Sequence, residues 1–258
     1  MLAIIDADSL VYEAAFAGQN TIEWEAGNPG TVLDLSAAIT HLKAAVDSIM
    51  RATGADEKIV CLSCPHREDN FRRVIYAEYK ANRKAGNRPL LLEALNQWAR
   101  EEYDAKVKHG IEADDTVGIL ATADLPSLPP KDQRIIVAID KDLETIPGLH
   151  YSWMHPDRGV VEVTEAAADY WHMHQTLTGD STDNYPGVRG IGPKRATKIL
   201  DASFPDMWPA VLAAFEAKGF DEEFALTQAR LARILRSDDY DFDNERPIMW
   251  TPEEATDA

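Results

Sequence analysis

The stretch Leu2-Ala-Ile-Ile-Asp6 decides the fold, because it is a short continuous apolar run that ends in a carboxylate. This pattern is typical of a buried parallel strand that delivers its last residue to the carboxyl end of a sheet. Apolar residues at helical spacing predict a crossover helix over residues 34–53, and a second strand follows at residues 58–63. A strand, a helix and a strand in this order predict an α/β fold with a mainly parallel sheet flanked by helices.

Asp6 would then lie at the sheet edge where α/β folds bind their ligands. A structural interpretation competes with this one, because an aspartate at the start of a helix also serves as its cap. Asp8 suits the same capping role. The residues themselves leave both interpretations open at this point.

The length of 258 residues and the hydrophobic content of 45% allow one large domain, or a core with a smaller lobe. The N-terminus lacks the cationic lead of a signal peptide and no apolar run approaches membrane length, so we expect a cytoplasmic protein. Cys61 and Cys64 have no second pair to complete a zinc site, which predicts free thiols. His172 and His174 would diverge on a helix, which favours packing over zinc binding.

The net charge of −18 argues against broad non-specific binding to nucleic acid, because the average surface repels phosphate. Residues 67–88 nevertheless hold seven basic against three acidic residues, and residues 189–198 hold four basic residues and no acid. Much of the surplus acid lies in the tail from Asp238 onward, which we expect to be a solvated face. Two short windows are therefore the candidates for contact with phosphate.

Acidic residues gather at two further predicted element ends. Glu112, Asp114 and Asp115 open an apolar helix over residues 110–120, where the helix dipole alone favours acids. Three carboxylates within four residues also repel one another, at a cost that a bound cation would remove. Asp140 and Asp142 follow a predicted strand over residues 134–139, and a hairpin of residues 149–153 and 160–163 comes next.

Residues 178–196 follow a predicted helix over residues 165–177. They contain a pair of carboxylates and a candidate phosphate-binding turn. Asp180 and Asp183 are three apart, so on a helical turn both would lie on one face and share a divalent cation. Residues 190–193, Gly-Ile-Gly-Pro, predict a tight turn that opens a helix, with backbone N–H groups free for a phosphate. An ordinary hairpin of two helices with solvated acids is the alternative. Further helices are expected at residues 196–200, 207–215 and 222–235.

An aromatic and cationic stretch lies at residues 78–84. Lys80 and Arg83 would project from one side of a helical turn, with Tyr79 as a stacking surface for a base. Exposed lysine and arginine are commonly only solubilising, which is the alternative interpretation.

These motifs resemble the 5′-nuclease (flap endonuclease) superfamily, and most closely the 5′–3′ exonucleases of short-tailed bacteriophages. The resemblance rests on Glu112-Ala-Asp-Asp115, Tyr79-Lys-x-Asn-Arg83, Asp140-x-Asp142 and residues 229–235, and on residues 178–196, which are similar to a helix-three-turn-helix element. It implies a PIN-like nuclease core at residues 1–164 with a short arch near 80–103. A helical duplex-binding lobe would follow at 165–258, with the helix-three-turn-helix near 175–200 and an acidic tail.

The resemblance implies a two-metal 5′–3′ exodeoxyribonuclease or structure-specific flap nuclease acting in phage DNA replication. Its substrate would be duplex DNA with a 5′ end, nick, gap or flap, and the protein would be a monomer. Two Mg²⁺ or Mn²⁺ ions would be held by Asp6, Glu112, Asp114 and Asp115, and by Asp140, Asp142, Asp180 and Asp183. Lys80 and Arg83 would be catalytic. DNA contacts would come from Tyr79, Lys84, Gly190, Ile191, Gly192, Lys194 and Arg195, and the turn at Gly190–Gly192 would also suit K⁺.

One departure concerns the loop after the second strand. The family usually has an aspartate there, whereas this chain reads Ser63-Cys64-Pro65-His66, which leaves Glu68 or Asp69 as substitutes. A haloacid-dehalogenase-type phosphatase is the alternative enzyme, with Asp6 and Asp8 as its Asp-x-Asp motif. It would need a strand before Asp180, and it leaves Glu112, Asp114 and Asp115 unexplained. A catalytically silent DNA-binding protein is a third alternative. It would be expected to have lost the metal-binding acids, whereas eight of the expected acids are present in this sequence.

Overall fold

A central five-stranded sheet organises the computed structural model, which describes residues 1–23, 29–83 and 88–252. The strands lie in the order β4-β1-β5-β6-β7. Their bounds are β1 Leu2–Asp6, β4 Glu57–Cys61, β5 Arg134–Val137, β6 Gly148–Tyr151 and β7 Val161–Val163. The first four strands run parallel and β7 runs antiparallel to β6. The predicted mainly parallel sheet is confirmed, and so is the hairpin at its end.

Strand β1 has a neighbour on each side, and its residues are buried from Leu2 to Asp6. Asp6 pairs with Cys61 at the end of β4, and Ile5 pairs with Val137 at the end of β5. Because parallel strands end at the same sheet edge, the loops after these three strands lie together. The sheet thus brings Asp6, Ser63 and Asp140 to one edge.

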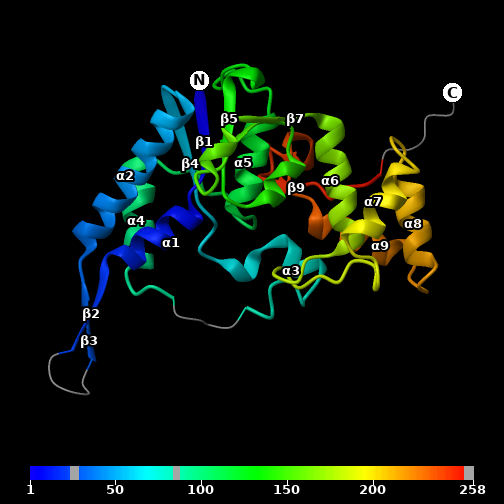
Figure 1. Ribbon diagram of the computed structural model, residues 1–258, viewed down its shortest axis with the longest axis horizontal. Helices are drawn as coiled ribbons and strands as arrows, with labels where there is room; N and C mark the ends of the chain where they lie inside the picture. Colours follow the sequence, from blue (N-terminus) through cyan, green and yellow to red (C-terminus); the bar gives the residue numbers. More distant parts are fainter. Residues whose placement is uncertain (24–28, 84–87, 253–258) are drawn as a thin grey trace.

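Helices cover both faces of the sheet (Figure 1), as the alternation of side chains along β1 requires. Ala3 and Ile5 share an apolar cluster with helices α1 Asp8–Ala17, α2 Leu35–Thr53 and α4 Leu92–Tyr103. Leu2 and Ile4 face helix α5 Ala113–Thr122 on the opposite side. Gly118 of α5 lies against the backbone carbonyl of Leu235, where a Cβ atom would collide.

A second apolar cluster holds the later helices together. These are α6 Glu165–Thr178, α7 Pro193–Asp201, α8 Trp208–Glu216 and α9 Glu222–Ala232. Leu177, Ile191, Leu200 and Phe215 are buried within this cluster. Pro193 occupies the first position of α7, as predicted, because a missing N–H costs nothing there.

The chain beyond α9 returns to α5. Leu235 and Tyr240 pack with Ile119, and a small hairpin follows, β8 Tyr240–Asp241 with β9 Arg246–Pro247. Asp239 is buried and forms an ion pair with Arg233, so the acidic tail is not wholly a solvated face. The division at residue 164 stays a prediction.

Several elements were not predicted. Strands β2 Gln19–Glu23 and β3 Pro29–Leu33 form an antiparallel hairpin next to α1, and α3 Phe71–Ile75 is a short helix. Short 3₁₀ helices are η1 Arg67–Asp69, η2 Lys131–Gln133, η3 Lys141–Thr145, η4 Pro156–Arg158 and η5 Ser237–Asp239. Residues 77–82 form turns rather than a helix. Within the described part of the chain, no helix has the length and apolar character needed to cross a membrane.

Candidate active site

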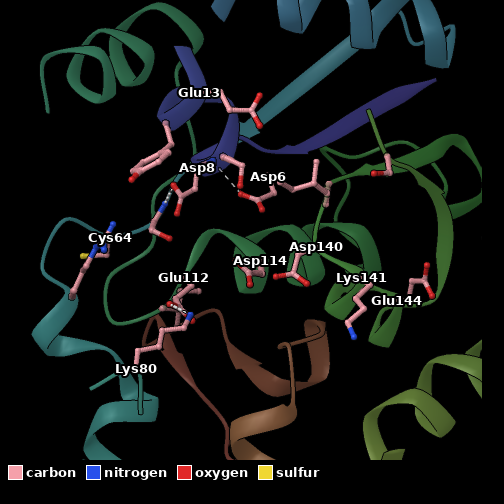
Figure 2. A pocket seen from close by; sticks show the side chains of 18 of the residues that line it. Asp6, Asp8, Glu13, Cys64, Lys80, Glu112, Asp114, Asp140, Lys141 and Glu144 are labelled. Atoms are coloured by element: carbon pink, nitrogen blue, oxygen red, sulfur yellow. Dashed lines mark hydrogen bonds and ion pairs between the residues drawn. The ribbon is translucent and has the colours of Figure 1, made fainter. Parts of the chain in front are cut away.

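A cavity of about 1440 Å³ opens at the carboxyl edge of the sheet. Its walls combine acids from the strand ends and helix starts with cations from the turn at residues 77–83 (Figure 2). The charged lining residues include Asp6, Asp8, Glu13, Glu112, Asp114, Asp140, Lys80 and Arg83.

Asp6 ends β1 inside this cavity and is 6% exposed. Burial raises the pKa of its carboxyl group to about 8, and the nearby carboxylates of Asp8, Asp140 and Glu112 add to the shift. The Oδ1 atom of Asp6 accepts the N–H of Asp8 at 3.2 Å, while Ala7 is the N-cap residue of α1. Asp6 therefore combines a local capping contact with a place in the cavity, so neither interpretation excluded the other.

The start of α5 supplies the next two acids. Glu112 is the N-cap residue, and its Oε1 accepts a hydrogen bond from Lys80 Nζ at 2.6 Å. Burial favours its neutral form, but Lys80 and Arg72 outweigh burial and lower the pKa of Glu112 to about 2. Burial raises the pKa of Asp114 well above its ordinary value, and the charges of Asp6 and Glu112 raise it further. Asp6 and Asp114 therefore repel each other across the cavity.

Asp115 does not take the metal-binding role that the sequence predicted. Its side chain is fully buried, and both oxygens accept hydrogen bonds from the Arg72 guanidinium at 2.7 Å. The backbone N–H groups of Leu235 and Glu112 use the remaining acceptor positions, each at 3.1 Å. The prediction is corrected here: Asp115 anchors Arg72 and the chain beyond α9 to the start of α5.

The second acidic group follows β5. Asp140 accepts the N–H of Asp142 at 2.9 Å through Oδ1. Burial, followed by the charges of Asp140 and Asp180, raises the pKa of Asp142 to about 7. Among the described residues, the buried Oδ1 atom of Asp142 has no hydrogen-bond partner. This oxygen atom is therefore available to bind a cation.

Asp180 and Asp183 do not share a helical turn, so that prediction was wrong. A backbone bridge between Asp180 and Tyr185 closes a tight loop after α6, and Asp180 Oδ1 accepts the N–H groups of Thr182 and Asp183. Gly179 and Gly187 approach each other at its base with positive φ angles of 66° and 57°, where side chains would clash.

Asp183 faces the cations instead. Its Oδ1 accepts a hydrogen bond from Arg83 at 2.8 Å, and its Oδ2 lies 3.4 Å from Lys80 Nζ. Lys80 and Arg83 thus share one carboxylate, although the segment that carries them is not helical. The predicted common orientation of the two cations is present.

Backbone contacts fasten the turn of residues 77–83 to the loop of residues 180–185. Lys80 N–H donates to the carbonyl oxygen of Asp183 at 2.8 Å. The side-chain amide of Asn82 donates to the Ser181 carbonyl at 2.7 Å, and that of Asn184 donates to the Glu78 carbonyl at 2.6 Å. Sequence reasoning missed both asparagines, and their position within the Lys80 and Asp183 motifs was the only available signal.

Tyr79 does not offer its ring to a base, which corrects the prediction of a stacking surface. The residue is 2% exposed, and its hydroxyl lies 2.9 Å from Glu112 Oε2 and 2.8 Å from Asp183 Oδ2. Tyr79 therefore fixes the positions of two carboxylates from different segments.

The turn at Gly190 leads into α7. Gly190 has a φ of 85°, which glycine adopts readily, and Gly192 is the N-cap residue. Ile191 is buried in the helical cluster, so its side chain is not available to DNA. Lys194 and Arg195 are exposed at the helix start. Lys84, the other predicted DNA contact, lies outside the described residues.

Residues 1–170 match a family described as 5′–3′ exonuclease, N-terminal resolvase-like domain, which is more than half of the chain. The chain is a member of this 5′–3′ exonuclease family. It is 27% identical to an exonuclease of Escherichia phage T7, with 97% of this chain and 93% of that protein covered. It is also 27% identical to a flap endonuclease Xni of Vibrio atlanticus, with 81% and 85% covered.

Solved structures support the family fold. The T5 D15 protein co-crystallised with metal ions superimposes with a TM-score of 0.57 at 16% identity, covering 90% of this chain and 85% of that one. A T5 D15 flap endonuclease in a pseudo-enzyme–product complex with DNA and metal ions gives 0.57 at 18% identity, with 90% and 88% covered. The phosphatase alternative fails on the fold, because Gly179 and Asp180 follow helix α6 rather than a strand.

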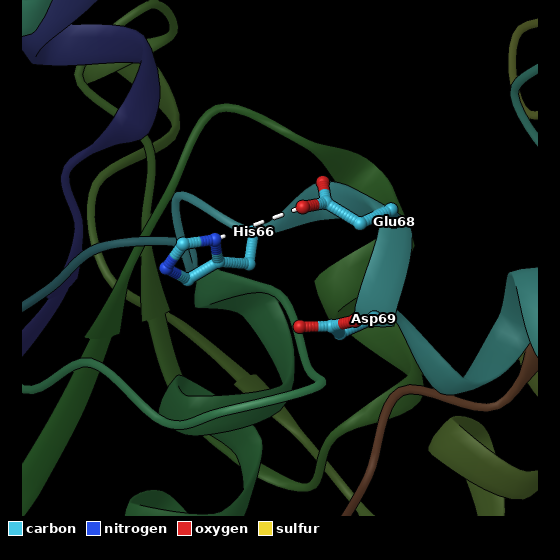
Figure 3. A group of neighbouring side chains, drawn as sticks. All are labelled: His66, Glu68 and Asp69. Atoms are coloured by element: carbon cyan, nitrogen blue, oxygen red, sulfur yellow. Dashed lines mark ion pairs between the residues drawn. The ribbon is translucent and has the colours of Figure 1, made fainter.

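The loop after β4 does not bring Glu68 or Asp69 into the cavity of this family member. Figure 3 shows both carboxylates, which lie on η1, grouped with His66 just before this helix, and all three residues are exposed. Glu68 lies 3.6 Å from His66, and Asp69 lies 3.6 Å from His109, as surface ion pairs. The predicted substitution by Glu68 or Asp69 is therefore corrected.

The cavity's donor set fits a hard divalent cation. Carboxylate oxygens are the ligands that Mg²⁺ and Mn²⁺ prefer. Within the described residues, Asp6, Asp114 and Asp140 line the cavity and make no ion pair with a lysine or arginine. Asp142, two residues after Asp140, makes none either among these residues, and burial raises the pKa of both Asp6 and Asp142. A bound cation would remove the repulsion among them.

Proposed function

We propose that this protein is a metal-dependent 5′–3′ nuclease that hydrolyses phosphodiester bonds of duplex DNA at a 5′ end, nick, gap or flap. The observation that carries the proposal is that Lys80 and Arg83 line one cavity together with acids from the strand ends and from the start of α5, and that Lys80 pairs with Glu112 there. Family membership and the phage T7 exonuclease relative support it. The products would carry a 5′-phosphate and leave a 3′-hydroxyl.

The carboxylates in and beside the cavity would act as two metal-binding groups. Asp6, Glu112 and Asp114 would hold one Mg²⁺ or Mn²⁺ ion, and Asp140, Asp142 and Asp180 would hold a second, with Asp183 between the second group and the cations. When bound, such ions activate water and stabilise a leaving oxygen. The chain's own contribution is to orient these acids through Tyr79 and the Asp142 N–H, and to present Lys80 to the scissile phosphate.

The exposed start of α7 would bind the duplex away from the reacting phosphate. Backbone N–H groups at a helix start attract phosphate, and Lys194 and Arg195 add positive charge. The same turn, Gly190–Gly192, suits K⁺ bound together with the DNA backbone. Residues 165–258 would form this duplex-binding lobe, and residues near 80–103 the arch. We place the protein as a monomer in the cytoplasm of a phage-infected host, where it acts in DNA replication.

Digestion of 5′-labelled and internally labelled DNA tests the proposal. Linear duplex, nicked duplex and 5′-flap substrates are incubated with Mg²⁺ or EDTA, and the products are sized. We expect Mg²⁺-dependent release of 5′-phosphorylated nucleotides or flap fragments. Asp114→Asn is the matched inactive control. Cleavage in EDTA would reject the proposed metal dependence. Release of inorganic phosphate alone would reject the nuclease proposal and revive a phosphatase.

A further inference from the structure

Asp8 is a cavity acid that the capping interpretation does not explain. It lies within the first turn of α1, whose N-cap residue is Ala7. Its Oδ1 atom accepts the backbone N–H of Ser63 at 3.0 Å, across to the loop after β4. The carboxylate therefore points away from its own helix and into the cavity beside Asp6 (Figure 2).

Ser63 holds this carboxylate in place from two sides. Its N–H binds Asp8, and its hydroxyl oxygen accepts the N–H of Ala113 at the start of α5, also at 3.0 Å. The Asp8 side chain is thereby tied to both the β4 edge and the helix that carries Asp114. A hydrogen bond that fixes one oxygen of a carboxylate orients the other, as partners behind metal ligands commonly do.

Among the described residues, Asp8 has no cationic partner. In the part of the chain that the structure describes, no lysine or arginine forms an ion pair with Asp8, whereas Glu112 pairs with Lys80 and Asp183 pairs with Arg83. Asp6 is nearly buried, contacts the Asp8 N–H and also lacks an ion pair. Two adjacent acids without a counter-ion destabilise the fold unless a cation joins them.

We propose that Asp8 is a further carboxylate ligand of the divalent ion that Asp6 holds, with Ser63 as the residue that positions it. The proposal rests on the metal dependence proposed above. The ligand class is a hard divalent cation, Mg²⁺ or Mn²⁺, because Asp6 and Asp8 both offer carboxylate oxygens. Helix α1 thus supplies the acid that the loop after β4 does not.

Glu13 provides a matched control. It lies on the same helix and lines the same cavity, but it is exposed. Among the described residues, the hydrogen bonds of Ser63 go to Asp8 and Ala113 and not to Glu13. Glu13→Gln removes one negative charge near the cavity, as Asp8→Asn does. Asp8→Asn keeps an oxygen that can accept the Ser63 N–H, so the anchor to the β4 loop is preserved.

Titration calorimetry of the full chain with Mn²⁺ tests the proposal without DNA. We expect Asp8→Asn to weaken binding at one site by about tenfold or more, the scale of a lost ligand or its partner. Glu13→Gln should change it by no more than about twofold, because charge at a distance is screened in 0.15 M salt. Equal effects of the two variants would mean that only net charge matters, which overturns the proposal.

Circular dichroism establishes whether Asp8→Asn is folded. If it is not, Asp8→Glu takes its place, since it keeps the charge but displaces the carboxylate by one methylene, and the same tenfold loss is expected. Wild-type affinity in that variant overturns the proposal. The two hypotheses fail differently: a wild-type chain that binds no Mn²⁺ removes the proposed function, whereas wild-type cleavage with unaltered Mn²⁺ binding by Asp8→Asn removes only the role of Asp8.

Discussion

The backbone N–H of Lys80 donates to the carbonyl oxygen of Asp183 at 2.8 Å, and Lys80 Nζ lies 3.4 Å from Asp183 Oδ2. Lys80 has a φ of 54°, a left-handed conformation that costs a non-glycine residue about 1–3 kcal/mol. The contacts with residues 181–184 hold it there. A strained backbone maintained in this way fixes the direction in which the ammonium group enters the cavity.

Lys80→Ala should therefore impair chemistry more than binding. If the ammonium group meets the scissile phosphate as charge builds, its removal lowers the single-turnover rate by about 10²–10³, as for other lost donors. DNA affinity should change much less, because the effect belongs to the transition state. Single-turnover cleavage at saturating enzyme, with affinity measured separately, checks this.

Lys106→Ala serves as the control, because Lys106 pairs with exposed Asp104 and does not line the cavity. Arg83→Ala should resemble Lys80→Ala, and the double variant should lose less than the sum, since both cations contact Asp183. A loss below about threefold for Lys80→Ala, far under that of a lost donor, would remove it from the active site.

Asp114→Asn should abolish cleavage and raise the stability of the metal-free protein. Burial and the charges of Asp6 and Glu112 raise the pKa of Asp114, so ionising it strains the fold. Relief of about 1 kcal/mol corresponds to roughly 2–4 °C in melting temperature for a domain of this size. Thermal melts in EDTA measure it. Asp132→Asn, an exposed acid on η2, should leave both properties unchanged. Full cleavage by Asp114→Asn would contradict the metal assignment.

The sequence predicted the sheet and most of the acids because both depend on local patterns. Apolar runs that end in Asp6 and Asp140 mark strands whose ends meet at one edge. The acids at the start of α5 were also found from a local pattern, because they directly precede an apolar helix. Asp115 was misassigned because its partner, Arg72, lies on a distant segment whose docking no local pattern reveals. Spacing shows that acids are near one another, but not which oxygens are already bound.

Tyr79 and Asp8 also have roles that depend on contacts with distant segments, which local sequence patterns do not reveal. An aromatic residue beside lysines suggested base stacking, but long-range packing buries Tyr79 against the acids of two segments. Asp8 suited a helix cap, and only the position of Ser63 shows that its carboxylate faces the cavity. The hairpin of β2 and β3 escaped prediction because its strands are short and carry no alternating apolar pattern.

Lys194→Ala and Arg195→Ala should weaken duplex binding and leave the saturated cleavage rate largely intact. Each lost phosphate contact lowers the slope of log affinity against log salt by about 0.9. Both side chains are exposed at the start of α7, so folding should not suffer. Binding isotherms between 50 and 200 mM salt, the range in which such contacts are felt, supply the measurement. Lys218→Ala, an exposed lysine after α8, is the control. An unchanged slope would mean that the Gly190 turn only connects two helices and does not contact the DNA backbone.

His172 should make the protein less stable in mild acid. Burial, with the charges of Arg233 and Arg236, lowers the pKa of His172 well below its ordinary value, while its Nε2 lies 2.8 Å from the Ala229 carbonyl oxygen. The unfolded chain takes up this proton near pH 6.5 and the folded chain does not. The stabilising contribution is therefore complete above pH 6.5 and is lost as the pH falls, by up to about 1.4 kcal/mol per pH unit.

Urea unfolding at pH 7.5 and 5.5 tests this sign in metal-free buffer. His172→Gln, which retains a donor for the Ala229 carbonyl, should lose less stability on acidification than the wild type. His155→Gln should keep the wild-type difference, because His155 is an exposed histidine on the loop before η4. An equal loss in wild type and His172→Gln would show that other groups cause the acid sensitivity. The wild type is compared with His172→Gln rather than judged alone, because the raised pKa values of Asp6 and Asp142, about 8 and about 7, stabilise the metal-free protein as the pH falls.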